Sequence, residues 1–336
     1  MIIDFKHVQS AHCENGAISN LLRFHNLEIS EPMAFGIGGG IFFAYMPFIK
    51  LNSLPVISYR IWPGQIFSRL TKALNIEVVK QKFSNKEYAM QELDRVLAEG
   101  NPVGLLTSVF YLLYLPKAYR FHFNAHNIVI FGKNGDNYLV SDPVMETTSE
   151  ISYSDLMRAR FAKGTFSPNG KMYYPVSVPQ QIDLKKAIYE GIQKTCNYML
   201  EIPVPLFGVN GIKYIASRMK KWEQKLGSEK AILYLGNMIR MQEEIGTGGA
   251  GFRFIYAAFL QEAGKKLNNN QLIELSKRMT EIGDRWREFA FLAGRICKNR
   301  SEKEVTFSYI SDILLDCANK EKQLFKELKN IPFTEY

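Results

Sequence analysis

The chain has 336 residues, 46% of them hydrophobic, so it carries enough apolar surface for one large domain or two smaller ones. This composition excludes a disordered or collagen-like chain. The formal net charge of +9 suits a nucleic acid, an anionic membrane or an acidic protein, but also a merely solvated basic surface. Basic and acidic residues are mixed, and no helix-turn-helix, RNP or zinc-finger pattern occurs, so we expect no nucleic-acid partner.

The four cysteines are too far apart for a CxxC metal site and too few for a disulfide framework. Residues 1–7 lack the features of a signal peptide. The longest apolar run, near 102–116, is shorter than the roughly 20 residues that span a bilayer. We therefore expect a soluble, cytoplasmic protein without a membrane partner. Its free thiols are Cys13, Cys196, Cys297 and Cys317.

The predicted elements divide the chain near residues 175–181. Before this point, short apolar runs interrupted by Gly, Pro and Asn predict both strands and helices. After it, apolar residues recur at i, i+3 and i+4, which is typical of helices. We therefore expect an α+β domain over 1–175, an extended linker or crossing over 164–179, and an all-helical domain over 180–336. The first domain has helices predicted at about 14–26, 63–75 and 86–99, and strands at 103–106, 127–131 and 138–140.

The first chemical candidate is Cys13, which lies where a helix is predicted to begin. Ala17, Ile18, Leu21 and Leu22 fall on one face of that helix. The unpaired N–H groups and the dipole at a helix start favour a thiolate and can also hold an oxyanion. All histidines, the usual bases at neutral pH, lie in the first 126 residues. They are His7, His12, His25, His122 and His126.

The second candidate is a predicted β-hairpin that carries His126 and Asp142. A three-residue loop over 133–135, with Gly135 in the left-handed conformation, would set these two residues opposite each other on one face. Cross-strand Cβ atoms lie about 4.5–5.5 Å apart, which suits an imidazole–carboxylate hydrogen bond. A two-residue loop would instead place the two side chains on opposite faces.

Cys13, His126 and Asp142 together offer a nucleophile, a base and an orienting acid. In this hypothesis His126 deprotonates Cys13 and later protonates the leaving group, while Asp142 fixes the imidazole tautomer. Without that chemistry, His126 would simply begin a strand and Asp142 a turn before Pro143.

A cysteine that opens the first helix, followed by a strand-borne histidine and then an acid, is the order of papain-like cysteine peptidases. Such enzymes usually carry a glutamine shortly before the cysteine as an oxyanion donor, a role that the resemblance implies for Gln9 or His7, beside the backbone N–H of Cys13. More specifically, the chain resembles the butirosin biosynthesis protein H family. The resemblance in the first half rests on His12-Cys13, 20–25, 29–31, 35–45, 114–116, 122–123, 126–129, Ser141-Asp142 and 156–160. Residues 246–253 and 258–263 resemble the helical domain that often follows in that family.

The resemblance implies a papain-like catalytic domain and a bacterial acyltransferase of secondary metabolism that uses Cys13, His126 and Asp142. Such an enzyme moves an acyl or aminoacyl group from a carrier-protein thioester to a small amine acceptor. An acidic acyl carrier protein is the implied partner. No cofactor is expected, although phosphopantetheine would arrive on the carrier. Two alternatives stay open: a hydrolase (peptidase, amidase or thioesterase) and a binding module without catalysis.

Further residues are candidates for substrate binding. Glu31 could face an amine, or be a turn residue before Pro32. The glycines near Gly39 and Gly40 would let the backbone pass close to the site, since no Lys-Ser/Thr follows them to make a phosphate loop. Arg253, in the first turn of a predicted helix, could meet a phosphate, or the helix could simply pack tightly. Tyr45 and His122 complete this set, and the aromatic residues of 110–123 line an acyl pocket or pack in the core.

A zinc site at His122 and His126 is not expected, because that segment is predicted to be a strand and lacks a third ligand.

Overall fold

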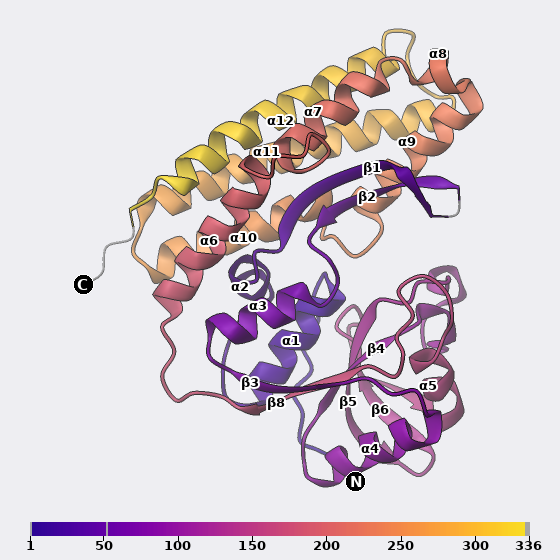
Figure 1. Ribbon diagram of the computed structural model, residues 1–336, viewed down its shortest axis with the longest axis vertical. Helices are drawn as coiled ribbons and strands as arrows, with labels where there is room; N and C mark the ends of the chain where they lie inside the picture. Colours follow the sequence, from indigo (N-terminus) through magenta and orange to yellow (C-terminus); the bar gives the residue numbers. More distant parts are fainter. Residues whose placement is uncertain (1, 52, 333–336) are drawn as a thin grey trace. The chain divides into compact units, whose positions relative to one another are not determined.

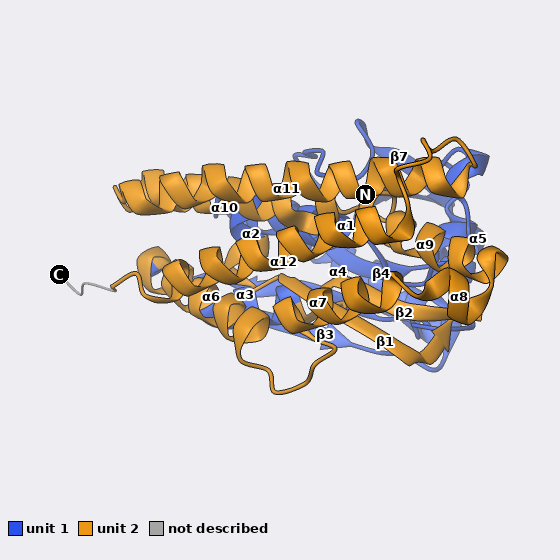
Figure 2. Ribbon diagram, turned by 90° about the horizontal axis from the view of Figure 1, so that it is seen from above, with its two compact units in different colours: residues 1–34, 66–183 blue, residues 35–65, 184–336 orange. Residues whose placement is uncertain are grey.

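The computed structural model describes residues 2–51 and 53–332, grouped in two compact units (Figure 2). Unit 1 combines residues 1–34 and 66–183, and unit 2 combines 35–65 and 184–336. Segment 35–65, which the sequence suggests as part of the first domain, therefore packs with the helical residues. The last four residues of the expected helical domain lie outside the described part of the chain. The expected α+β class is confirmed.

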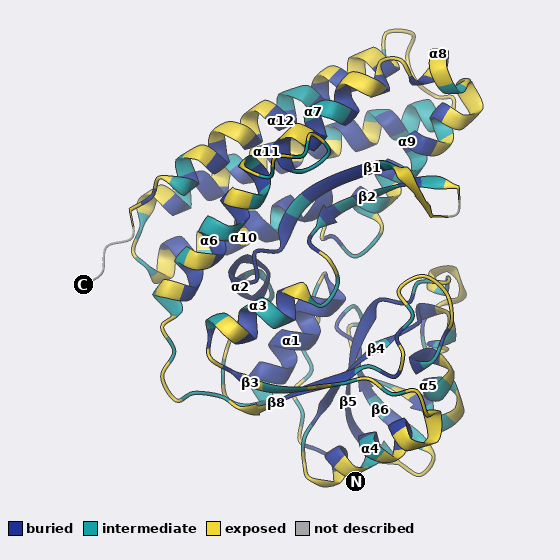
Figure 3. Ribbon diagram, in the orientation of Figure 1, coloured by how far each residue is buried: buried dark blue, intermediate teal, exposed yellow. Residues whose placement is uncertain are grey.

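Unit 1 is organised around an antiparallel six-stranded sheet in the order β3-β8-β4-β5-β6-β7 (Figure 1). Strands β4 and β5 lie inside the sheet and are mostly buried, as expected of runs rich in Val, Ile and Leu (Figure 3). The bounds are β3 (Glu77–Gln81), β4 (Val103–Thr107), β5 (His126–Asn134), β6 (Asn137–Ser141), β7 (Ser149–Ser152) and β8 (Met172–Ser177).

Helices cover the sheet of unit 1. Helix α1 packs on β5, β4 and β8, whereas Leu93 of α4 and Leu156 of α5 join Leu105 and Ile128 of the sheet in one hydrophobic core. Asn85 caps α4 by accepting from the N–H of Tyr88. The helices are α1 (Cys13–Phe24), α2 (Glu31–Ile37), which continues into unit 2, α3 (Gln65–Ala73), α4 (Lys86–Ala98) and α5 (Tyr153–Arg160). The short turns η1 (Val109–Tyr111) and η2 (Lys117–Tyr119) lie between β4 and β5.

The hairpin of β5 and β6 differs from the three-residue loop expected. Asn134 pairs with Asn137, so the connection has two residues, and Gly135 begins it with a φ of 58°. A β-bulge at Phe131 then adds one residue to β5, because Ile130 pairs with Val140 and Gly132 with Leu139. This extra residue changes which side chains of β5 and β6 point to the same face of the sheet. His126 and Asp142 thus share a face as diagonal neighbours rather than directly opposed ones.

The segment expected as a linker contains a strand. Strand β8 lies between β3 and β4, and Tyr173 pairs with Lys80 on one side and with Gly104 on the other. Gly104 leaves room for this, because a Cβ there would lie 2.3 Å from the Tyr173 ring. The chain therefore closes the sheet of unit 1 before it enters the helices of unit 2.

Unit 2 consists of long helices and the two-stranded sheet of β1 (Ile41–Leu51) and β2 (Leu54–Arg60). Residues 35–65, which the sequence assigns to the first domain, pack here with the helices, because alternating strands do not reveal which partner they pack against. Here Phe43 and Tyr59 contact Trp286, and Asn237 donates to the carbonyl of Pro55. The helices are α6 (Leu184–Leu200), α7 (Gly208–Met219), α8 (Trp222–Leu226), α9 (Ser228–Glu243), α10 (Arg253–Lys266), α11 (Asn270–Cys297) and α12 (Phe307–Lys329), with the turn η3 (Ala250–Phe252).

Among the described residues, no helix combines the length and the apolar composition needed to cross a membrane.

Candidate active site

Cys13 is the first residue of α1, as the sequence predicts, and it is buried, with 8% of its surface exposed. His12 caps the helix, and its Nδ1 accepts from the N–H of Asn15 at 3.4 Å. The N–H of Gly16 donates to the carbonyl of His12. The thiol therefore lies at the start of the helix, at the positive end of its dipole, an arrangement that favours a thiolate.

Glu31 supports the peptide that precedes Cys13. Its Oε1 accepts from the N–H of His12 at 2.7 Å and its Oε2 from the N–H of Ala11 at 2.9 Å. Burial raises the pKa of Glu31, and these two N–H groups oppose the rise by stabilising the carboxylate. The expectation that Glu31 faces an amine substrate is therefore corrected: both carboxylate oxygens bind the backbone of the nucleophile loop.

His126 and Asp142 form a buried hydrogen-bonded pair. Nε2 of His126 donates to Oδ2 of Asp142 at 2.8 Å, and Asp142 has no exposed surface. Burial by itself lowers the pKa of His126, but the charges of Asp142 and Cys13 and hydrogen bonds to both outweigh it and hold this pKa well above its usual value. The imidazole therefore favours its charged form.

Cys13 completes this group, because its side chain hydrogen-bonds to His126. Nε2 of His126 is used by Asp142, so Nδ1 is the nitrogen left for Cys13. The structure thus brings together the three residues that the sequence suggested, in the order thiol, imidazole, carboxylate. An imidazolium beside a thiol at a helix start stabilises the thiolate, which is the nucleophilic form.

Asp142 has two further donors, and the sequence identified neither. The hydroxyl of Tyr114 donates to Oδ2 at 2.9 Å, and the N–H of Val144 donates to Oδ1 at 3.2 Å. Burial raises the pKa of Asp142, yet His126, Tyr114 and Val144 outweigh it and lower this pKa below its usual value. The sequence names Tyr114 only as one of the aromatic residues of 110–123, and no local pattern links it to Asp142.

The loop before Cys13 is bound to the turn after Asp142. The N–H of Ser10 donates to the carbonyl of Pro143 at 2.7 Å. Gly16 allows this contact, since a Cβ there would lie 2.5 Å from the Cβ of Pro143. The start of α1 and the turn after Asp142 are thereby held against each other.

The two side chains proposed as oxyanion donors lie in different settings. Nδ1 of His7 bonds to the hydroxyl of Ser141 at 2.8 Å and Nε2 to the carbonyl of Met145 at 3.0 Å, so both of its nitrogens are occupied. His7 therefore binds the end of β6 and the turn after Asp142. Gln9 is exposed. The backbone N–H of Cys13 stays a candidate for the oxyanion role.

Two regions of the chain match known protein families. Residues 12–143 match the family described as butirosin biosynthesis protein H, N-terminal, and residues 154–328, just over half of the chain, match the domain of unknown function DUF4872. The chain belongs to the butirosin biosynthesis protein H-like family. The first matched region contains all three residues of the Cys13–His126–Asp142 group.

Other comparisons add little to this family assignment. No protein of the curated set matches the chain significantly. Among solved structures, a protein from Bacillus anthracis described as a C39-like peptidase matches with 12% identity and a TM-score of 0.36, covering 53% of this chain and 98% of its own.

Several substrate-binding candidates lie in unit 2 of this butirosin biosynthesis protein H-like chain, where packing accounts for them. A Cβ on Gly40 would meet the ring of Phe35 at 2.4 Å. Gly39 has a φ of 59° and faces Lys194, and Tyr45 is buried. These glycines therefore serve a close approach within unit 2.

The expectation that Arg253 meets a phosphate is also corrected, because its side chain is fully buried. Its Nε and Nη2 donate to the carboxylate of Glu321 at 2.9 and 3.1 Å, and its Nη1 donates to the carbonyl of Gly251. Trp286 donates to the same carboxylate at 2.6 Å. Arg253 holds unit 2 together and offers no surface to a phosphate.

His122, by contrast, is exposed in unit 1, and its ring stacks on that of Phe110 with centroids 4.1 Å apart. Tyr119 of the same segment is 65% exposed, whereas Tyr111, Tyr114 and Phe123 pack against the core. The aromatic residues of 110–123 thus divide between core packing and the surface.

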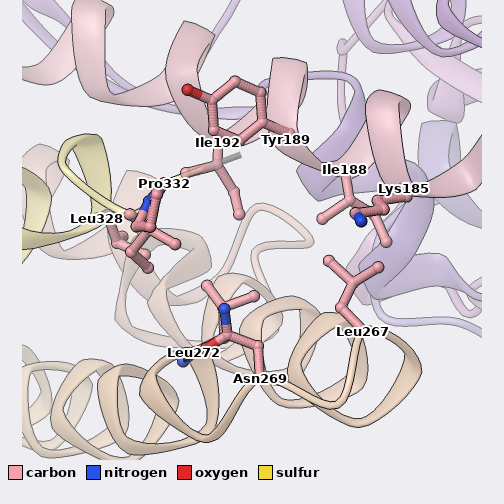
Figure 4. Close-up of a pocket in the computed structure, with 10 residues that line it drawn as sticks. Lys185, Ile188, Tyr189, Ile192, Leu267, Asn269, Leu272, Leu328 and Pro332 are labelled. Carbon is pink, nitrogen blue, oxygen red and sulfur yellow. Dashed lines mark hydrogen bonds between the residues drawn. The ribbon is translucent and has the colours of Figure 1, made fainter. Parts of the chain in front are cut away.

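A cavity of about 200 Å³ lies within unit 2 (Figure 4). Lys185, Tyr189 and Ile192 of α6 line it together with Leu272 and Leu328. No group of three or more His, Cys, Asp or Glu side chains among residues 2–51 and 53–332 could hold a metal ion.

Proposed function

We propose that the protein is a cysteine-dependent acyltransferase that takes an acyl or aminoacyl group from a thioester and passes it to an amine. The observation that carries the proposal is the buried chain of hydrogen bonds from Cys13 through His126 to Asp142. Membership of the butirosin biosynthesis protein H-like family supports a cysteine enzyme with this type of fold.

In the first half-reaction the Cys13 thiolate attacks the thioester carbonyl. The N–H of Cys13 would stabilise the oxyanion that develops. As the tetrahedral intermediate collapses, the bond to the leaving thiol breaks and His126 gives that thiol its proton. An acyl-Cys13 thioester and a neutral His126 result.

In the second half-reaction the amine attacks the acyl-Cys13 carbonyl. His126, now neutral, accepts the proton that the amine loses. The carbon–sulfur bond then breaks, which restores the thiolate and leaves an amide as product. Asp142 stays ionised throughout and stabilises imidazolium when it forms.

Hydrolysis of the same acyl-enzyme is the alternative within this chemistry. Water would then replace the amine as the second nucleophile. Transfer wins over hydrolysis when a bound amine reaches the acyl-Cys13 carbonyl before water does. The acyl donor that we propose is an acidic carrier protein, which the net charge of +9 would attract at low salt.

The test is intact-protein mass spectrometry after incubation with a panel of acyl thioesters. We expect an acyl adduct on the wild-type chain and none on Cys13→Ala. Loss of the adduct when an amine is added, with formation of the amide, supports transfer; loss at the same rate without amine supports hydrolysis. If no thioester labels the chain and iodoacetamide alkylates Cys13 no faster than Cys297, the binding-module alternative replaces the proposal.

A further inference from the structure

Three lysines of unit 1 lie together at the edge of its sheet. Lys80 belongs to β3, the edge strand, and pairs with Tyr173 of β8. Gln81 pairs with Met172 and the N–H of Phe83 donates to the carbonyl of Asn169, so Lys82 and Lys171 lie opposite each other between these contacts. Because directly opposed residues and alternate residues share a face, Lys80, Lys82 and Lys171 project from the same side of the sheet.

The side chain of Lys80 is held by specific contacts. The ammonium of Lys80 donates to the hydroxyl of Ser68 at 2.8 Å and lies 4.9 Å from the ring centroid of Phe67. Lys80 and Lys82 are exposed, and Lys171 is half-buried. Lys80 is thus held in place, with Lys82 open to solvent on the same side of the sheet.

Packing contacts link this surface to the start of α1, because Lys80 lies over Phe67, whose N–H donates to the carboxylate of Glu14. The ring of Tyr173 packs at a tilt against that of Phe67 with centroids 4.6 Å apart, and its hydroxyl donates to Asn127, the neighbour of His126. Burial raises the pKa of Tyr173, and the charges of Glu14 and Cys13 raise it further. The charge of Glu14, the residue after Cys13, also raises the pKa of Lys171.

The lysines repel one another. Burial lowers the pKa of Lys80, and the charge of Lys171 lowers it further. Burial and the charge of Lys82 likewise lower the pKa of Lys171. Glu14 opposes this for Lys171, but its carboxylate is buried and accepts from the N–H of Phe67. An anion that binds among the three ammonium groups would relieve their repulsion.

We propose that Lys80, Lys82 and Lys171 form the recognition surface for the phosphate group of the acyl donor. The inference rests on the proposed acyl transfer and adds the part of the donor that is recognised. Biological acyl thioesters carry their acyl group on a pantetheine thiol whose other end bears a phosphate. Lysine binds phosphate as a point charge, and three of them suit its negative charge. The buried Arg253 offers no such contact.

The experiment compares two donors that differ by one phosphate, an acyl 4′-phosphopantetheine and the same acyl pantetheine. We replace the three lysines by Gln, which removes the charge and keeps the side-chain stem over Phe67. The rate of Cys13 acylation by the phosphorylated donor should fall about tenfold or more, and the rate with the unphosphorylated donor should change less than about twofold. Added salt should reduce only the advantage of the phosphorylated donor.

A matched control replaces three exposed lysines elsewhere in unit 1, Lys6, Lys86 and Lys163, by Gln. This control should leave the ratio of the two rates unchanged. Equal rates with the two donors in the wild type, or an equal effect of the lysine substitutions on both, would overturn the inference and leave acyl transfer standing.

A second measurement does not depend on catalysis. S-methyl 4′-phosphopantetheine, which cannot transfer an acyl group, should protect Cys13 from iodoacetamide more than S-methyl pantetheine does. The protection should disappear in the triple variant. If neither donor acylates Cys13 but this selective protection is seen, acyl transfer fails while the phosphate surface stands; absence of the protection refutes the surface itself.

Discussion

Tyr114 donates its hydroxyl hydrogen to the same oxygen of Asp142 that accepts from His126. The tyrosine lies 28 residues before the carboxylate, in the connection between β4 and β5. Together with the N–H of Val144 it satisfies a carboxylate that has no contact with water. Tyr114 is therefore a positioning residue for the acid of the proposed triad.

Tyr114→Phe should move the acid-side loss of Cys13 reactivity to higher pH by about one unit. The groups that face Asp142 are Tyr114, His126 and, through His126, Cys13. Without the Tyr114 hydroxyl, burial raises the pKa of Asp142, and a neutral Asp142 no longer stabilises imidazolium. A hydrogen bond to a charged group contributes about 1.5–3 kcal/mol, and one pH unit corresponds to about 1.4 kcal/mol.

The measurement is the rate of Cys13 alkylation by iodoacetamide from pH 3 to 9, with peptide masses to separate Cys13 from the other thiols. Tyr111→Phe makes the same chemical change in a half-buried neighbour that packs on the core. If Tyr114 has only a structural role, Tyr114→Phe will lower the melting temperature, but the pH midpoint of Cys13 alkylation will be the same as in Tyr111→Phe.

Glu31→Gln should slow alkylation of Cys13 by about three- to tenfold and destabilise the fold by about 1–3 kcal/mol. A glutamine keeps one acceptor oxygen, so the N–H of either Ala11 or His12 loses its partner. Urea unfolding and the alkylation rate at pH 7 check the two effects. Glu28→Gln is the control: its side chain is 72% exposed and pairs with Arg23, so a change within about 0.5 kcal/mol is expected. Equal behaviour of the two variants would contradict the role of Glu31.

The stability that the His126–Asp142 pair contributes should depend on pH in a defined direction. The folded pKa of His126 is raised, so its contribution is fully present below the unfolded pKa of about 6.5 and is lost as the pH rises through the folded value. The folded pKa of Asp142 is lowered, so its contribution is present above about 3.9 and is lost as the pH falls.

His126→Gln should therefore reduce the free energy of unfolding most between about pH 4 and 6.5, and less at pH 9 and above. The expected loss is about 1–3 kcal/mol, because the buried Asp142 loses a donor. Urea titrations of the wild type and the variant at pH 5.5 and pH 9.5 measure it. A difference that grows toward alkaline pH would show that His126 is neutral in the folded protein.

Arg253→Met should destabilise the protein by about 3–5 kcal/mol, because it leaves the Glu321 carboxylate buried without its cation. The double variant Arg253→Met with Glu321→Leu should recover most of that loss. Denaturant unfolding measures both. If instead Arg253→Met unfolds normally but impairs acylation by a phosphorylated donor, Arg253 binds substrate after all.

Local residue patterns were enough to predict several parts of this protein. The spacing of Ala17, Ile18, Leu21 and Leu22 predicts the helix that Cys13 opens, and the apolar run after His126 predicts β5. These features depend on neighbours within a few residues, so they are visible in the sequence. The same patterns, with the family resemblance, identified Cys13, His126 and Asp142 as one candidate group.

The sequence alone did not determine the groups that hold that site in place. Glu31 reaches the N–H of Ala11 over 20 residues, and the carboxylate of Glu321 meets Arg253 over 68. The bulge at Phe131 sets which face Asp142 shares with His126. Each of these depends on which distant segments pack together, because a buried charge or an extra strand residue is stabilised only by partners that folding brings to it. Residue spacing thus identified the chemical groups, and tertiary packing decided what each of them binds.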